Sequence, residues 1–173
     1  EHYMRFRPLA EARGFLYCYP DGTTDRAGAQ FWNATDVSDY FNAGTDDAGY
    51  LRALIEEISR QFAVDRKRVY LIGHSNGGCM AYRMACQSAD LVAGIASLAC
   101  KTFLAPSRRL PSQPVTPLPL SRTRDPLVPY SCRALRGAVP CGGGAVLWLG
   151  IPREDGAVDG LWGYSGRGHG QRV

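Results

Sequence analysis

One stretch of the chain has the residue types of a hydrolytic nucleophile. Residues 73–77 read Gly-His-Ser-Asn-Gly, the pattern G-x-S-x-G, with Ser75 at its centre. A serine hydroxyl is a weak nucleophile at neutral pH, so it must stand clear of its own backbone and beside a base. Small residues on both sides permit the sharp strand-to-helix turn that exposes such a hydroxyl. The pattern therefore predicts that Ser75 is the nucleophile of an acyl-transfer reaction.

The segments beside this motif predict the elements that would position Ser75. Residues 69–72 are apolar and mostly β-prone, which indicates a buried strand, and apolar residues recur at helical spacing over residues 80–85. The start of such a helix points amide groups and a positive dipole end to the place where an oxyanion forms. The alternative is a glycine-rich turn of any α/β protein, in which Ser75 serves only as a helix N-cap.

Composition limits the class of protein. With 173 residues, 45% hydrophobic and 10% aromatic, the chain is expected to be one soluble globular domain. No apolar run approaches the roughly 20 residues of a membrane-spanning helix, and the charged start at residues 1–5 does not resemble a signal peptide. The net charge of +4 is uneven, since residues 101–173 carry 10 basic and 4 acidic side chains. These arginines are scattered without interleaved aromatics, so we expect no nucleic-acid partner.

The six cysteines show no C-x-x-C pair and no ligand-like Cys/His spacing, so no zinc site is predicted. Four of them lie in apolar runs and are expected to pack as small buried residues: Cys18, Cys79, Cys86 and Cys100. Cys132 and Cys141 lie in a loop-rich region and could form a disulfide if the protein is exported. The sequence leaves that pairing open.

The order of elements in the first hundred residues predicts an α/β fold. A short amphipathic helix over residues 3–13 ends at Gly14, and residues 15–19 follow as a strand. Acidic residues 46 and 47 open a helix, and residues 69–72 and 91–98 are expected to be apolar strands. Alternating strands and helices with fully apolar strands are typical of a mostly parallel sheet covered on both faces.

A long polar loop, residues 23–44, separates the first strand from the second helix and carries Trp32. Loops of this length in a compact domain are usually functional or mobile. We therefore expect Trp32 either to line a substrate cleft or to plug the core as a buried aromatic ring.

The last third of the chain has a different character. Residues 101–173 hold 9 of the 11 prolines and 11 of the 20 glycines, a proportion typical of loops or poor order. Prolines exclude residues 118–120 from a sheet interior, although a strand end is possible there. Residues 146–149 are the only later run with good strand composition. We divide the chain into a partial α/β core, residues 1–130, and a divergent Gly/Pro/Arg-rich segment, residues 131–173.

Several motifs together resemble the secreted α/β-hydrolase esterases grouped as poly(3-hydroxybutyrate) depolymerase-like and feruloyl esterase-like proteins. They are residues 14–23 (Gly-Phe-Leu-Tyr-Cys-Tyr-Pro-Asp-Gly-Thr), 31–35 (Phe-Trp-Asn-Ala-Thr), 46–51 (Asp-Asp-Ala-Gly-Tyr-Leu), 68–78 (Arg-Val-Tyr-Leu-Ile-Gly-His-Ser-Asn-Gly-Gly), 81–86 (Ala-Tyr-Arg-Met-Ala-Cys) and 124–130 (Arg-Asp-Pro-Leu-Val-Pro-Tyr). The resemblance covers about residues 3–130. It implies an α/β-hydrolase fold that lacks the family's N-terminal strands here and diverges in the C-terminal third.

The resemblance also implies roles for individual residues. Ser75 matches the family nucleophile, and the backbone N–H of Asn76 matches one oxyanion donor. Asp125 matches the acid that orients the catalytic histidine, although an Asx-turn before Pro126 is the alternative. The family's second oxyanion donor belongs to a strand upstream of this chain's first residue.

The catalytic histidine is harder to place. The family's Gly-Gly-Gly-His-Thr-Trp segment is not found, and the chain has only three histidines. His2 lies at the terminus, and His74 is too constrained beside the nucleophile to act as its base. His169 remains the candidate, against the alternative of a histidine in an unstructured tail.

The function expected from the resemblance is serine carboxylic-ester hydrolysis through an acyl-enzyme. The substrate would be a hydroxyalkanoate polyester or an aromatic ester on plant cell-wall polysaccharide, with no metal or organic cofactor and no membrane partner. An extracellular or periplasmic location is implied in the same way, and the oligomeric state is left open. The alternative is a catalytically impaired or inactive hydrolase-fold fragment.

Overall fold

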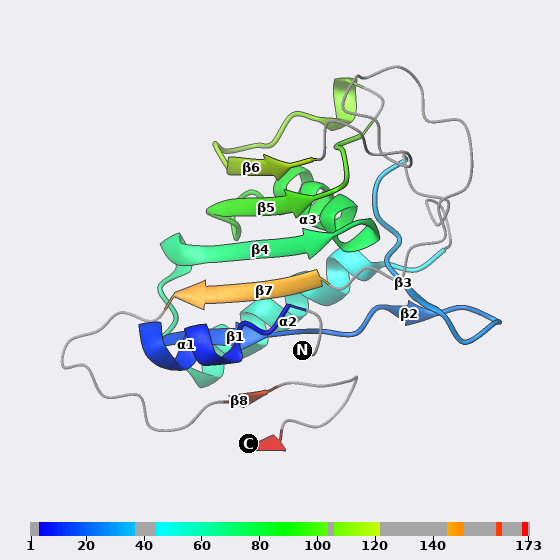
Figure 1. The fold of residues 1–173 in the computed structure, drawn as a ribbon. Helices are drawn as coiled ribbons and strands as arrows, with labels where there is room; N and C mark the ends of the chain where they lie inside the picture. The colour runs from blue at the N-terminus through cyan, green and yellow to red at the C-terminus, as the bar shows by residue number, and fades with distance from the viewer. Residues whose placement is uncertain are drawn as a thin grey trace.

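The computed structural model describes residues 4–36, 44–103, 106–121, 145–150, 162–163 and 171–172. Its centre is a five-stranded sheet in the order β1-β7-β4-β5-β6 (Figure 1). The strands are β1 (Phe15–Cys18), β7 (Ala145–Gly150), β4 (Val69–His74), β5 (Gly94–Leu98) and β6 (Thr116–Leu120). Strands β4, β5 and β6 are parallel, as the sequence predicts, whereas β7 runs antiparallel to both β1 and β4. An apolar run such as residues 146–149 indicates a strand but carries no information about its direction.

Helices lie on both faces of the sheet, which confirms the predicted layering. Helices α2 (Asp47–Gln61) and α3 (Asn76–Gln87) lie behind the sheet in Figure 1, and α1 (Arg7–Arg13) lies in front of it. The larger buried cluster contains Leu16 and Leu71 together with residues of α2 and α3. The smaller cluster joins Phe15 and Tyr17 to α1. Successive strand residues thus serve opposite faces, as the pleat requires.

Local signals set the helix boundaries. Helix α1 ends at Gly14, whose φ of 63° places it in the left-handed conformation that glycine adopts at little cost. Helix α2 begins after Asp46, whose side chain accepts a hydrogen bond from the N–H of Gly49 at 2.9 Å. One side of this helix is buried at Leu51, Leu54, Ile55 and Ile58, which recur at helical spacing.

The remaining elements are short. Strands β2 (Thr23–Thr24) and β3 (Gln30–Phe31) pair antiparallel within residues 23–44, the segment predicted from the sequence to be a long polar loop. Two 3₁₀ turns, η1 (Arg66–Arg68) and η2 (Pro106–Arg108), precede β4 and β6. Strands β8 (Trp162–Gly163) and β9 (Gln171–Arg172) pair antiparallel.

The proline-containing strand β6 is at the edge of the sheet, where its missing amide hydrogens break no interior ladder. This confirms that residues 118–120 lie outside the sheet interior. None of the helices in the described ranges is long and apolar enough to cross a bilayer.

Candidate active site

Ser75 occupies the turn between β4 and α3. Its φ of 53° and ψ of −122° lie in a region that residues with a side chain rarely adopt. Backbone strain of this kind gathers at functional sites, and a strained strand-to-helix turn is the geometry of a nucleophile elbow. The N–H of Ser75 donates to the carbonyl of Leu98 at 2.8 Å, which fixes the turn to the end of β5. The arrows of β4, β5 and β6 point the same way in Figure 1, and Ser75 directly follows the last residue of β4. Ser75 therefore lies at the carboxyl ends of the parallel strands, the usual edge for a site in an open α/β sheet.

Glycines make this turn sterically possible. A Cβ atom added to Gly73 would lie 2.1 Å from the carbonyl oxygen of Gly77, on the other side of the turn. A Cβ atom on Gly78 would lie 2.8 Å from Ser97 Oγ and 3.0 Å from the Leu98 oxygen. The structure thus confirms the sequence argument that small residues flank Ser75 because the chain folds back on itself there.

Ser75 is half-buried and occupies the N-cap position of α3, but its side chain makes no capping hydrogen bond to the helix. The structure therefore does not show the side-chain capping that the alternative interpretation assigns to this serine. Cys18 and Cys86 are the free cysteines of the described residues, and both are poor rivals as nucleophiles. Burial raises the pKa of Cys18 to about 12 and also raises the pKa of Cys86.

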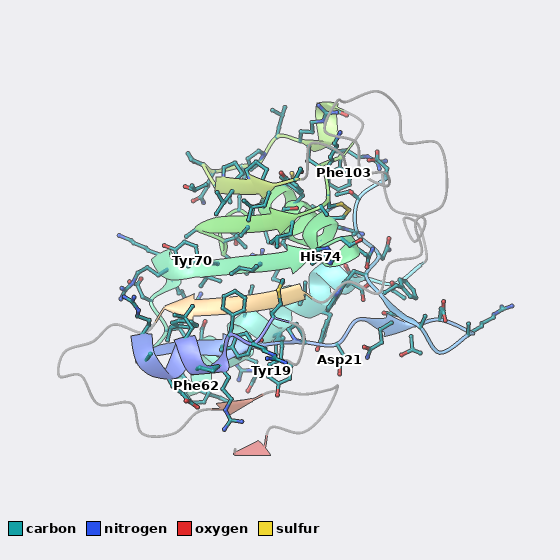
Figure 2. The ribbon with its side chains drawn as sticks, in the orientation of Figure 1. Tyr19, Asp21, Phe62, Tyr70, His74 and Phe103 are labelled. Carbon is teal, nitrogen blue, oxygen red and sulfur yellow. A yellow bond between two sulfur atoms is a disulfide. The ribbon has the colours of Figure 1, made fainter. Side chains whose placement is uncertain are left out.

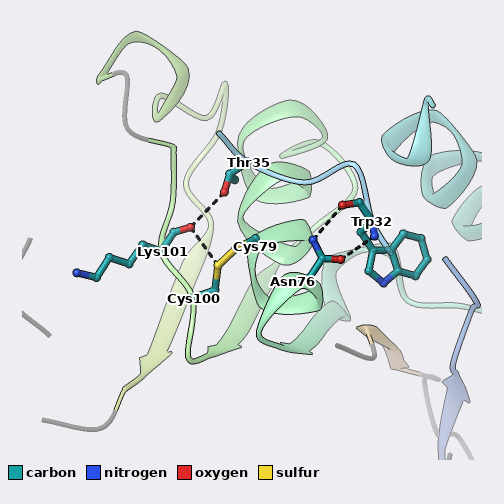
Figure 3. The surroundings of a disulfide bond; sticks show 6 residues. All are labelled: Trp32, Thr35, Asn76, Cys79, Cys100 and Lys101. Carbon is teal, nitrogen blue, oxygen red and sulfur yellow. Dashed lines mark hydrogen bonds between the residues drawn. A yellow bond between two sulfur atoms is a disulfide. The ribbon is translucent and has the colours of Figure 1, made fainter. Parts of the chain in front are cut away.

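Asn76 is the first residue of α3, so its amide belongs to the helix end at which negative charge is favoured. Its side chain is 4% exposed and binds the main chain of a distant segment. Asn76 Oδ1 accepts from the N–H of Trp32 at 2.6 Å, and Asn76 Nδ2 donates to the carbonyl of Trp32 at 3.0 Å (Figure 3). No sequence signal indicates this pairing, because the two residues are 44 positions apart.

The Trp32 ring is 2% exposed and lies in the larger core cluster. It stacks on Tyr50 with ring centroids 6.4 Å apart and an interplanar angle of 17°. This corrects the expectation that Trp32 lines an open substrate cleft, since the ring takes the position of the alternative, an aromatic plug. The physical reason is that the Trp32 backbone is hydrogen-bonded to Asn76 of α3, while its indole ring packs on Tyr50 of α2.

The segment that follows Trp32 is held by charged side chains. The carboxylate of Asp47, 1% exposed, accepts from the N–H of Asn33 at 2.7 Å and from the hydroxyl of Thr23 at 2.9 Å. The guanidinium of Arg83 donates to the carbonyls of Asn33 and Ala34. Sequence reasoning interpreted Asp47 only as a helix-start charge and missed its buried contacts.

A disulfide joins Cys79 in α3 to Cys100 just beyond β5 (Figure 3). Both residues are buried, as the sequence predicts, but the expectation that they pack as unpaired small residues is wrong. The crossover from β4 through α3 to β5 brings their Cα atoms to 5.4 Å across a separation of 21 residues. Sequence spacing carries no information on that distance.

The other expected triad members, Asp125 and His169, lie outside the described residues, as do Cys132 and Cys141. His74, at the carboxyl end of β4 (Figure 2), is the only histidine in the part of the chain that the structure describes. Within that part, no group of three or more His, Cys, Asp or Glu side chains could hold a metal ion.

A hollow of about 460 Å³ lies against the C-terminal half of α3 and is lined by Asn33, Arg83, Cys86, Gln87, Phe103, Ser107, Arg108 and Leu110. Ser75 does not line it. Arg83 lies eight residues beyond Ser75, a rise of about 12 Å along a helix. We therefore do not count this hollow as part of the candidate site at Ser75.

A strained serine between a parallel strand and a helix, flanked by close-packed glycines, is the arrangement of the α/β-hydrolase class. The family model described as "Esterase PHB depolymerase" matches residues 2–105, more than half of the chain. The chain therefore belongs to the esterase PHB depolymerase family.

Named relatives agree with this assignment. The chain is 31% identical over 131 residues to "Putative esterase NocK" of Nocardia uniformis subsp. tsuyamanensis, covering 75% of this chain and 37% of that protein. It is 31% identical over 121 residues to "Feruloyl esterase B" of Piromyces equi, covering 68% of this chain and 22% of that protein. It is 29% identical over 98 residues to "Poly(3-hydroxybutyrate) depolymerase" of Ralstonia pickettii, covering 53% of this chain and 19% of that protein. The chain thus spans well under half the length of these relatives, and no solved structure matches it.

Proposed function

We propose that this chain carries the nucleophile half of a serine carboxylic-ester hydrolase. The observation that supports this most is the backbone of Ser75, a residue with a side chain held at a φ of 53° where a strand becomes a helix. Such a strained turn costs on the order of 1–3 kcal/mol and persists only where the surrounding structure requires it. The chain belongs to an esterase family, and a nucleophilic serine in such a turn would explain why the strain is kept.

In the proposed reaction, Ser75 Oγ attacks the carbonyl carbon of an ester while a histidine accepts the hydroxyl proton. The backbone N–H of Asn76 donates to the oxyanion, and the histidine returns the proton to the departing alcohol. Water then attacks the acyl-enzyme and releases the carboxylic acid. His169 is the proposed base and Asp125 the acid that orients it, both carried over from the family resemblance.

The proposed substrates are a hydroxyalkanoate polyester or an aromatic ester on a plant polysaccharide. Relatives named poly(3-hydroxybutyrate) depolymerase and feruloyl esterase B support these two classes about equally. We also propose that the protein works outside the cytoplasm or in the periplasm. The Cys79–Cys100 disulfide supports this location, because disulfides persist mainly in oxidising compartments.

Labelling with a fluorophosphonate, mapped by mass spectrometry, tests whether Ser75 is activated. We expect the phosphonyl group on the peptide that contains Ser75 and no labelling of the Ser75→Ala variant. Hydrolysis of p-nitrophenyl butyrate should fall to background in the same variant. Equal hydrolysis by the two proteins would contradict the proposal.

A second candidate is a hydrolase-fold chain with impaired or no catalysis. It is supported by the absence of the family's Gly-Gly-Gly-His-Thr-Trp segment from the sequence. A folded wild-type protein that neither reacts with the fluorophosphonate nor hydrolyses the ester would favour this candidate.

A further inference from the structure

The residue that follows the nucleophile joins two parts of the fold that are distant in sequence. Asn76 contributes its backbone to the first turn of α3 and its side chain to the segment around Trp32. Its amide group faces the main chain of that segment and forms both hydrogen bonds that a neighbouring β-strand would supply (Figure 3). The side chain is therefore directed into the protein and cannot reach a substrate on the exposed side of the turn.

The hydrogen bonds between Asn76 and Trp32 are buried, so losing either one leaves a polar group without a partner. Asn76 is 4% exposed and Trp32 is 2% exposed, so water cannot replace either hydrogen bond. Two opposed hydrogen bonds fix the plane of the carboxamide, and through a short side chain they fix the backbone to which it is attached. That backbone carries the amide proposed to bind the oxyanion.

The Trp32 segment is itself rigidly held, which makes it a useful reference point. Asp47 of α2 accepts from the N–H of Asn33, and Arg83 of α3 donates to the carbonyl of Asn33. The Trp32 ring stacks on Tyr50 of α2. The segment is thus fastened to two helices independently of Asn76.

We infer that Asn76 is a positioning residue for ester hydrolysis: its carboxamide, bound to the Trp32 backbone, holds the first amide of α3 in the direction the oxyanion requires. This rests on the proposed function, because it concerns the same serine. An oxyanion donor contributes mainly when charge has developed on the carbonyl oxygen, so misplacing it affects the transition state more than substrate binding.

The test compares Asn76→Ala with Arg83→Met. Both substitutions remove hydrogen bonds to the same segment, but only the first one touches the residue after the nucleophile. We expect Asn76→Ala to lower kcat for p-nitrophenyl butyrate by about 10- to 100-fold, with KM changed by less than about threefold. Fluorophosphonate labelling of Ser75 should slow by a similar factor. Arg83→Met should keep kcat within about threefold of the wild type.

Two further measurements separate positioning from general loss of structure. Amide hydrogen exchange at Trp32, whose N–H loses its acceptor, should quicken in Asn76→Ala and stay slow in Arg83→Met, in which Asn76 and Asp47 still hold the segment. Thermal unfolding shows that each assay is run with folded protein. Equal loss of kcat in the two variants, or an unchanged kcat in Asn76→Ala, would overturn the inference. If the wild type itself is not labelled, the proposed function falls and this inference falls with it.

Discussion

Cys79, four residues beyond Ser75, is covalently bonded to Cys100, two residues beyond the strand-end carbonyl that accepts the Ser75 N–H. The turn that presents the proposed nucleophile is therefore fixed to β5 twice, by a hydrogen bond from Ser75 to Leu98 and by a disulfide one helical turn later. Both connections join α3 to the same strand end. The turn at Ser75 and the first turn of α3 are therefore both attached to the end of β5.

Loss of the disulfide should destabilise the fold without abolishing it. Closing a loop of this length lowers the entropy of the unfolded chain, and we expect replacement of both Cys79 and Cys100 by Ala to cost about 3 kcal/mol. Urea unfolding of the two proteins measures this difference. Dithiothreitol should lower the stability of the wild type toward that of the double variant, and an equal response of both proteins would place the reducible bond elsewhere.

Gly73→Ala should disrupt the turn, because the new Cβ atom would lie 2.1 Å from the carbonyl oxygen of Gly77. We expect a loss of about 2 kcal/mol or more, typical of overpacking against rigid backbone. Gly28→Ala is the matched control, since its Cβ atom meets nothing within 4 Å although its φ is +83°. That variant should lose only about 1–2 kcal/mol from its left-handed conformation. A loss at Gly73 no larger than the loss at Gly28, measured by chemical denaturation, would contradict the expected steric clash at Gly73.

Asp47→Ala should be far more damaging than Asp46→Ala. Asp47 is buried and accepts hydrogen bonds from the Thr23 hydroxyl and the buried N–H of Asn33, so its removal takes a charged acceptor away from both donors. We expect a cost of about 3 kcal/mol for Asp47→Ala. Asp46 caps α2 from an exposed position, and its loss should cost about 1 kcal/mol. The melting temperatures of the two variants show which substitution destabilises the protein more. A lower melting temperature for Asp46→Ala than for Asp47→Ala would contradict the importance of the hydrogen bonds to Asp47.

The ion pair between Arg52 and Asp90 should make stability weakly dependent on pH. Hydrogen bonding from Arg52 lowers the pKa of Asp90, and the same bond raises the pKa of Arg52. An acid whose pKa is lowered in the folded state contributes stability above its unfolded pKa, and loses it as the pH falls through the folded value. Both side chains are partly exposed, so the contribution should be at most about 1 kcal/mol.

Asp90→Asn checks this. Its stability should lie below that of the wild type near neutral pH, and the difference should vanish at pH values well below 3.8, the ordinary pKa of the carboxyl. About 1 M NaCl should also reduce the difference. A difference that grows on acidification would have the wrong sign for this ion pair.

Much of the first hundred residues could be predicted from local patterns. Apolar periodicity indicated α3, and Gly14 and Asp46 marked the boundaries of α1 and α2, because each acts on its own few neighbours. The strand at residues 69–72 and the turn at Ser75 could also be predicted, because both depend on residues adjacent in sequence. The antiparallel direction of β7 could not be predicted, because strand composition is the same for either direction.

The site shows the same division. The sequence by itself determined where the tight turn forms and which hydroxyl lies in it, because glycines stand at the positions around Ser75 where a Cβ atom would clash. Only the tertiary structure decided that Asn76 binds Trp32, that Asp47 is buried, and that Cys79 meets Cys100. Those partners are separated by 14 to 44 residues, and their distances are set by how α2 and α3 pack on the sheet. Contacts of that kind depend on the whole arrangement of the chain, which no local pattern encodes.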